Sequence, residues 1–142
     1  MLVVDILRKK GNDVVAIPPE ATMADAAKVL SAHRIGAVLV RDAGGAVLGI
    51  LSERDIVKGI AHKGEAVLAD SVTSWMTRNV VTCEPGDAIA SVMETMTRRR
   101  IRHVPVTENG ELAGVVSIGD VVKHRIEETL AEVEAMTGYL RS

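Results

Sequence analysis

The sequence contains the same pattern twice, and this internal repeat limits the possible folds more than any other feature of the chain. Residues Val14–Pro19 align with Val80–Pro85 at an offset of 66 positions, and Arg34-Ile35 aligns with Arg100-Ile101 at the same offset. Self-similarity at a fixed period indicates one supersecondary unit that is built more than once. The 142 residues therefore hold two copies of a unit of roughly 65 residues.

The offset changes at one turn, where insertions are tolerated. The second copy turns at Glu108–Glu111, whose central Asn-Gly is a strong short signal for a β-hairpin. The first copy turns at Asp42–Ala46 and has one residue more. Beyond the turn, the sequence GILSERD at Gly49–Asp55 aligns with GVVSIGD at Gly114–Asp120. Both copies thus share the pattern Gly-h-h-Ser-x-x-Asp, where h is an apolar residue.

Each copy is predicted to fold as strand, helix, strand, hairpin turn, strand and helix. The first helix of each copy carries apolar residues at positions i, i+3, i+4 and i+7, which lie on one helical face. These residues are Met23, Ala26, Ala27 and Leu30 in the first copy and Ile89, Val92, Met93 and Met96 in the second. Thr22 and Asp25 form a capping-box pattern, and Asp87 is the expected cap of the second helix.

The middle strands of the first copy are predicted at Ala37–Val40 and Val47–Leu51. Their uninterrupted apolar sequence is typical of strands that are covered on both faces. Pro105 has no amide hydrogen to donate and indicates an edge strand in the second copy. The predicted fold class is therefore α+β (mixed), with two pseudo-twofold related β-α-β-β-α units packed through their sheets.

Three segments are predicted: residues 1–66 with an N-terminal lead, residues 67–126, and a C-terminal amphipathic helix at 127–142. This last helix carries apolar residues on one side and acidic residues opposite. The apolar residues are Ile126, Leu130, Val133 and Leu140. Such a helix needs a partner surface, which belongs either to this chain or to a second subunit.

The composition argues against several functions. A net charge of −2 and a near absence of aromatic residues disfavour nucleic-acid binding. The single cysteine, Cys83, cannot form an internal disulfide, which indicates a reducing compartment. No apolar stretch approaches the roughly 18 residues of a membrane span, and the N-terminal apolar run is too short for a signal peptide. We expect a soluble, cytoplasmic protein that binds neither nucleic acid nor membrane.

No enzyme or metal site is indicated. The four histidines, His33, His62, His103 and His124, do not have metal-ligand spacing. Neither a Walker A motif nor Gly-x-Gly-x-x-Gly is present. Cys83 has no identifiable base partner, so it is interpreted as a small buried hydrophobe. We expect no catalytic residues, no catalytic cofactor and no metal.

The two Gly-h-h-Ser-x-x-Asp patterns, each at the end of an apolar strand, resemble the signature of the CBS (cystathionine-β-synthase) domain. Thr77-Arg78-Asn79 resembles the segment that leads into such a domain, and the resemblance covers approximately residues 5–126. It implies a stand-alone, disc-like tandem pair that binds adenosyl ligands such as AMP, ATP, NAD or S-adenosylmethionine in clefts between its two domains. It also implies regulation rather than catalysis.

The Ser and Asp of each pattern have chemistry that suits such a ligand. Ser52 and Ser117 each begin a helix, where free amides and the helix dipole attract phosphate. Asp55 and Asp120 follow in the first turn, and an ionised carboxylate accepts hydrogen bonds from both hydroxyls of a ribose. The alternative is structural, because Ser-x-x-Asp is close to a capping box, which needs no ligand. Both interpretations hold if the capping serine shares its hydroxyl with a ligand.

Adenine needs an apolar slot with backbone donors and acceptors. The residues expected to supply it are Val15, Ala16, Ile17, Ile35, Val81, Thr82, Cys83 and Ile101. Arg102 and His103 replace Gly36 and Ala37 of the first copy. The resemblance implies that basic side chains at these two positions point toward the phosphates, which the arginine fork can grip. The alternative is a solvated cluster at a helix C-terminus, which explains Arg98-Arg99.

Arg54 is the candidate phosphate-binding cation of the first copy. Its counterpart is Gly119, so the two clefts are not expected to be equivalent. The expected function is a homodimeric regulatory sensor of adenine nucleotides (AMP, ATP or NAD) that acts in trans on an unidentified protein target. The alternative is a ligand-free structural or dimerisation module, in which the last helix mediates assembly.

Overall fold

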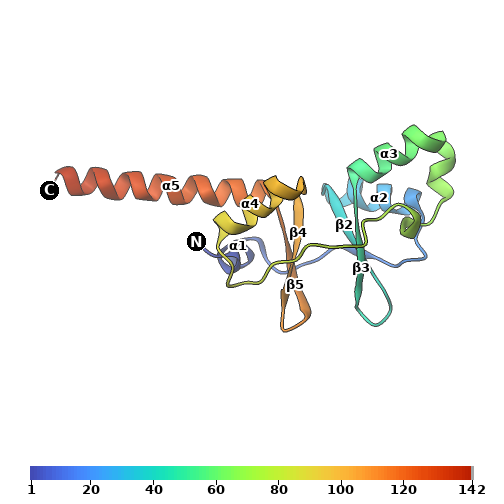
Figure 1. The fold of residues 1–142 in the computed structure, drawn as a ribbon, viewed down its shortest axis with the longest axis horizontal. Helices are drawn as coiled ribbons and strands as arrows, with labels where there is room; N and C mark the ends of the chain where they lie inside the picture. The colour runs from blue at the N-terminus through green and yellow to red at the C-terminus, as the bar shows by residue number, and fades with distance from the viewer. Residues whose placement is uncertain (142) are drawn as a thin grey trace. The chain divides into compact units, whose positions relative to one another are not determined.

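The structure is a computed structural model that describes the backbone of residues 1–141 and the side chains of residues 1–138. Figure 1 shows the order of its elements. They are α1 Val3–Lys10, β1 Ala16–Ile17, α2 Met23–His33, β2 Ala37–Arg41, β3 Val47–Ser52, α3 Glu53–Lys63, the 3₁₀ helices η1 Gly64–Ala69 and η2 Val72–Ser74, α4 Ile89–Arg99, β4 His103–Glu108, β5 Glu111–Ser117 and α5 Ile118–Arg141. The chain forms two compact units: Val14–Val80 is one, and Met1–Asp13 with the chain from Val81 onward is the other.

The unit Val14–Val80 contains a three-stranded sheet in the order β1-β2-β3. β1 pairs parallel with β2, and β2 pairs antiparallel with β3. The predicted apolar face of α2 lies in the core, where Met23 and Ala26 are fully buried. At its N-terminus, Thr22 Oγ1 accepts the amide hydrogen of Asp25 at 3.2 Å. The helix, its capping box and the two middle strands are therefore confirmed.

The second copy repeats this arrangement with the antiparallel hairpin β4-β5. Cys83 forms one parallel bridge with Val106, as β1 pairs with β2 in the first copy. Asn109 and Gly110 have φ of 53° and 80°, the left-handed pair that a type I′ hairpin turn requires. Pro105 lies in β4 of this two-stranded sheet, and its carbonyl accepts the amide hydrogen of Cys83 at 3.0 Å, so the predicted edge of β4 is partly covered by the segment of Cys83. The α+β fold class and the duplicated unit are confirmed.

α1 precedes the first copy in the sequence but packs into the second copy. Its buried apolar residues belong to the core of the unit that begins at Val81. These residues are Val3, Ile6 and Leu7. The amide of Ile89 donates to the carbonyl of Met1 at 3.1 Å, which joins the start of α4 to the lead.

The connector, residues 64–80, has the equivalent role in the other unit. Val67 and Val72 are fully buried in the core of the first copy. The amide of Met23 donates to the carbonyl of Asp70 at 2.8 Å, which joins the start of α2 to this connector. The compact units therefore differ from the predicted limits at 66 and 67, because each lead packs with the copy that it does not precede.

The two first helices end alike but begin differently. Arg34 and Arg100 terminate α2 and α4 in the left-handed conformation, with φ of 54° and 55°. Asp87 does not cap α4, whose N-cap position is Ala88. Its carboxylate instead accepts the amide hydrogen of Glu84 at 2.8 Å, so it stabilises the turn before the helix.

α5 is continuous from Ile118 to Arg141 and projects beyond the rest of its unit (Figure 1). The second helix of the second copy and the predicted C-terminal helix are thus one element, with no break at residue 126. Ser142 and the side chain of Leu140, which the prediction included, lie outside the described residues.

Candidate functional site

The Ser-x-x-Asp pattern of the first copy lies where β3 meets α3. The amide of Ser52 donates to Asp55 Oδ2 at 2.8 Å, and the Ser52 hydroxyl donates to the same oxygen at 3.2 Å. Both residues are half-buried. Among the described residues of its unit, no lysine or arginine forms an ion pair with Asp55. The carboxylate is therefore fixed at a helix N-terminus with acceptor capacity remaining.

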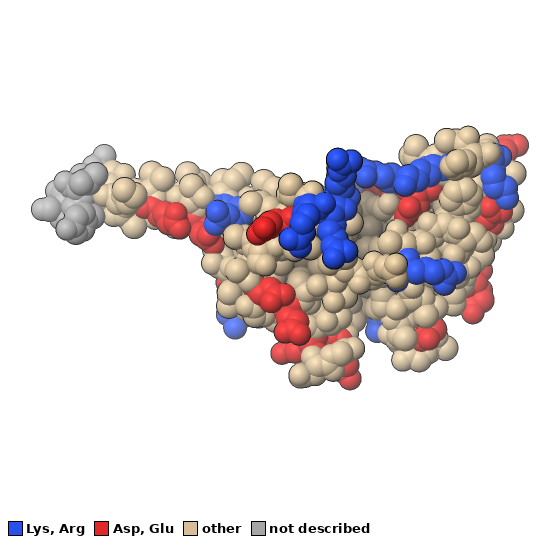
Figure 2. Space-filling model, viewed as in Figure 1, with Lys and Arg blue, Asp and Glu red and all other residues tan. Residues whose placement is uncertain are grey.

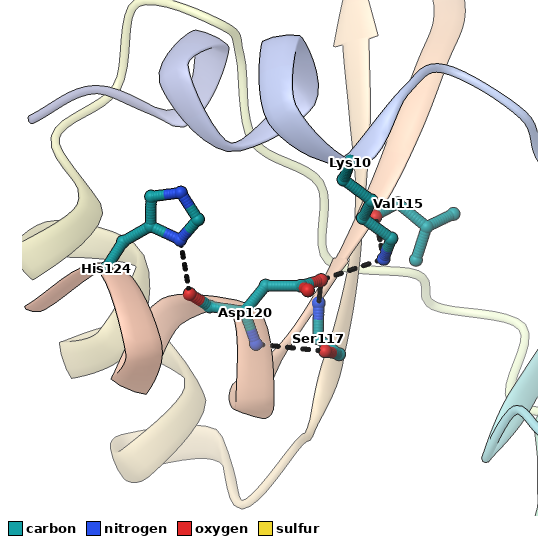
Figure 3. Close-up of polar contacts among 5 residues, drawn as sticks. All are labelled: Lys10, Val115, Ser117, Asp120 and His124. Carbon is teal, nitrogen blue, oxygen red and sulfur yellow. Dashed lines mark hydrogen bonds and ion pairs between the residues drawn. The ribbon is translucent and has the colours of Figure 1, made fainter. Parts of the chain in front are cut away.

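The pattern of the second copy has the same fold but an additional partner (Figure 3). The amide of Ser117 donates to Asp120 Oδ2 at 2.9 Å, and the amide of Asp120 donates to Ser117 Oγ at 3.2 Å. This is a complete capping box, so the structural interpretation is confirmed here. Lys10, at the end of α1, donates to Asp120 Oδ2 at 2.7 Å and to the carbonyl of Val115 at 2.9 Å. The two acidic sites are therefore not equivalent.

His124 lies one turn after Asp120 on α5 and is 4% exposed. Its Nδ1 is 2.9 Å from the carbonyl oxygen of Asp120 (Figure 3). Its Nε2 is buried and has no hydrogen-bond partner among the described residues. The ring thus packs inside its unit beside the acidic site.

Lys10 changes the ionisation of Asp120. Burial of the carboxyl group favours its neutral form, but the hydrogen bonds from Lys10 and Ser117 outweigh burial and hold the pKa of Asp120 below its usual value. A lowered carboxyl pKa adds stability that is present above the pKa of the unfolded chain. That stability is lost as the pH falls through the native pKa.

We expect Lys10→Met to lower the free energy of unfolding by about 0.5–1 kcal/mol at pH 7, since the ion pair is partly exposed. The difference from the wild type should shrink as the pH falls below the ordinary carboxyl value of about 4 and on through the lowered native pKa of Asp120. Urea denaturation between pH 7 and pH 3 measures it. Lys58→Met, at an exposed position on α3, is the control. A difference that stays constant down to pH 3 would contradict the assignment.

Arg102 and His103 lie beside the Ser-x-x-Asp pattern of their own unit. His103 begins β4 and is paired in register with Ser117 of β5. Ala37 is paired in the same way with Ser52 in the first copy. His103 is half-buried, and Arg102 is exposed. The second copy therefore places basic residues at the strand end that adjoins its helix N-terminus, where the first copy has none.

Exposed arginines surround this strand end. They are Arg98, Arg99, Arg100 and Arg102. Figure 2 shows a gathering of Lys and Arg over the C-terminal end of α4. In the other unit, Arg54 is exposed on the first turn of α3. These positions leave the arginines accessible to an anionic ligand.

The residues predicted for the adenine slot differ in accessibility. Ile17 and Cys83 are 6% and 7% exposed and belong to the cores of their units, so only their backbone groups remain for a ligand. The others are half-buried (Val15, Ile35, Val81, Ile101) or exposed (Ala16, Thr82). Burial, with a contribution from Asp87, raises the pKa of the Cys83 thiol to about 12, which opposes a nucleophilic role.

Metal-ligand clusters and membrane-spanning helices are both absent from the described part of the chain. No three His, Cys, Asp or Glu side chains there are placed to hold a metal ion. None of the described helices is both long enough and apolar enough to cross a membrane.

The chain matches the family model of the CBS domain twice, at residues 3–62 and 71–127. Among curated proteins, the mitochondrial CBS domain-containing protein CBSX3 of Arabidopsis thaliana is 31% identical over 145 residues, which cover 96% of this chain and 70% of that protein.

Solved structures of the same family also resemble the chain. The CBS-domain containing protein ATU1752 from Agrobacterium tumefaciens has 54% sequence identity and a TM-score of 0.87, covering 88% of this chain and 99% of that one. The CBS domain pair of protein MJ0100, solved in complex with 5′-methylthioadenosine and S-adenosyl-L-methionine, has 26% identity and a TM-score of 0.80, covering 90% and 98%. With both copies of its repeat matched, the chain belongs to the CBS domain family and contains a tandem pair of these domains.

Proposed function

We propose that this CBS domain pair is a regulatory module that binds an adenosyl ligand, AMP, ATP or NAD, and acts in trans on a protein target. The observation that carries the proposal is the Asp55 carboxylate, which Ser52 fixes at the N-terminus of α3. No lysine or arginine among the described residues of its unit pairs with it, unlike Asp120, so it can accept both hydroxyls of a ribose. The ligands of MJ0100 support the proposal, because both contain adenine and ribose.

The other groups of the ligand are assigned by charge and position. Phosphate oxygens are attracted by cations and by hydroxyl and amide groups at a helix N-terminus. The proposed phosphate-binding residues are Ser52, Arg54, Arg102, His103 and Ser117. Adenine is assigned to the half-buried residues around β1 and its counterpart, with the backbones of Ile17 and Cys83 as hydrogen-bond partners.

The two acidic residues are expected to bind with different affinity. A ribose at Asp120 has to share the carboxylate with Lys10, whose ammonium already donates to Oδ2. A ribose at Asp55 meets no lysine competitor among the described residues of that unit. We therefore expect the site of Asp55 to fill first.

Calorimetric titration with AMP, ATP, NAD and S-adenosylmethionine tests this function, together with thermal unfolding. A ligand at 100 times its dissociation constant should add about 2.7 kcal/mol of stability. Asp55→Asn keeps the shape of the side chain but removes its charge. It should weaken the tighter binding event about tenfold or more, because hydrogen bonds to a charged acceptor are lost.

Glu65→Gln is the matched control, since it removes one exposed carboxylate from the same unit outside the pattern. The affinity of this control variant for the ligand should equal that of the wild type. If no adenosyl compound binds at millimolar concentration, the proposed function is wrong. If a ligand binds and Asp55→Asn leaves its affinity unchanged, the ribose assignment is wrong although the function stands.

A ligand-free dimerisation module is the second candidate. It is favoured by the row of exposed apolar side chains on α5, which the proposed binding site does not use. Dimerisation by itself is compatible with ligand binding, because that row lies on a part of the helix that carries none of the ligand-binding residues.

A further inference from the structure

We propose that α5 is a dimerisation helix that pairs with the α5 of a second copy of this chain as an antiparallel two-stranded coiled coil. Five exposed residues of α5 follow one another at alternating intervals of four and three. They are Val122, Ile126, Thr129, Val133 and Met136. This is the spacing of the a and d positions of a heptad repeat, in which the apolar seam of one helix faces that of another.

The row is distinct from the face that α5 uses within its own unit. Val121 and His124 are 0% and 4% exposed, and α5 contacts α1 and α4 on this side. At about 100° per residue, the exposed row lies roughly 130° around the helix from that face. Ile126 and Val133 are 55% and 53% exposed as a result. Packing inside the monomer therefore leaves the row uncovered.

The charges beside the row disfavour a parallel partner in register. Arg125 and Glu132 precede the a positions Ile126 and Val133, so they are the g residues of the heptads. In a parallel pair each g residue faces the following e residue of the other helix. Arg125 would then face the partner's Leu130, so no opposite charges would meet there.

An antiparallel pair brings the opposite charges together. If Val122 packs against the partner's Val133, the g residues of the two helices face one another. Arg125 then lies opposite the partner's Glu132, and the symmetry of the dimer makes the same pair twice. In the monomer Arg125 contacts Glu128. Its guanidinium has five donors, so it can keep that contact and bind the second carboxylate. This complementarity selects a second copy as the occupant.

The same alignment places Thr129 against the partner's Ile126. Thr129 is the one polar residue among the five of the row, and it weakens the seam at two symmetric places. Thr129→Leu should therefore tighten the dimer about tenfold or more, since apolar burial is gained twice. This gain is specific to pairing through the row.

Molar mass in solution, measured by light scattering at about 1 to 100 µM, tests the interface. The wild type should be dimeric at the upper end, and Ile126→Glu should be monomeric with unchanged circular dichroism. Val57→Glu, at a 65% exposed position on α3, is the control and should stay dimeric. A monomeric wild type, or an Ile126→Glu variant that stays dimeric, would overturn the proposal. Nucleotide affinity is measured for the same variants by titration. A failure of the interface can then be distinguished from a failure of the proposed function.

The orientation is tested by charge exchange and by disulfide trapping. Arg125→Glu should weaken the dimer, and Arg125→Glu combined with Glu132→Arg should restore it. In a Cys83→Ser background, the double variant Val122→Cys/Val133→Cys should form a covalent dimer under mild oxidation. Val133→Cys alone should not, because the antiparallel arrangement separates the two copies of residue 133. Efficient crosslinking of Val133→Cys alone would show a parallel coil and overturn the orientation.

Discussion

Replacing Ile6 with alanine is expected to cost about 2–5 kcal/mol of stability, although Ile6 precedes the repeat and lies in a segment that sequence alone treats as a lead. Ile6 is 0% exposed and belongs to the core that contains Ile89, Val116 and Val121. Its side chain therefore fills the second copy, and truncation leaves a cavity that the surrounding strands cannot close. Urea denaturation followed by circular dichroism measures the loss.

The residue before this helix, α1, supplies the control. Leu2 is 42% exposed, so Leu2→Ala should change the free energy of unfolding by less than about 1 kcal/mol. Trp75 lies in the other unit and reports on it by fluorescence. An Ile6→Ala variant that is as stable as the wild type would show that α1 is dispensable. If Ile6→Ala lowers the stability reported by Trp75 fluorescence and not that of the other unit, α1 stabilises the first copy.

The repeat and its elements could be predicted because their signals are local. The apolar face of α2, which begins with Met23, appears directly in the spacing of neighbouring residues. The hairpin at Asn109-Gly110 follows from the φ angles that those residue types tolerate. Even the paired Arg34 and Arg100 were visible in the alignment. Their role as left-handed helix ends was not, because that position usually favours glycine.

The sequence does not predict that each lead packs with the copy that it does not precede, because backbone groups make many of the contacts. The carbonyl of Met1 accepts the amide of Ile89, and the carbonyl of Asp70 accepts that of Met23. Every residue except proline has an amide hydrogen, so such pairing leaves no side-chain signal in the sequence. The apolar residues of α1 predicted a buried face but not the core in which that face lies.

The candidate site was predicted in part. The Ser and Asp residues lie at strand–helix junctions as expected, and His103 lies across the sheet from Ser117. Lys10 was missed, since it is separated from Asp120 by 110 positions and follows a segment that was assigned to the first copy. Only the packing of α1 into the second copy brings the two residues together. The asymmetry between the two sites therefore comes from a lead as well as from Arg54, Arg102 and His103.

The glycine of the repeated pattern also depends on the leads, and Gly49→Val tests this with a cost of about 3 kcal/mol or more. A Cβ atom at Gly49 would lie 2.7 Å from the backbone carbonyl oxygen of Thr77, in the connector that pairs with β3 at Ile50. At Gly114 the nearest atom, also at 2.7 Å, is the end of the Leu7 side chain, which can move.

Alanine substitutions should therefore rank by what the new Cβ meets. Gly49→Ala should destabilise most, Gly114→Ala less, and Gly86→Ala least, because nothing lies within 4 Å of a Cβ at Gly86. Urea denaturation of the three variants measures the order. If Gly49→Ala and Gly86→Ala lower the free energy of unfolding equally, the close approach of the connector is not the reason for a glycine at position 49. The expected order means that the first residue of the pattern serves the packing of the leads, whereas the role that we propose for its Ser and Asp is ligand binding.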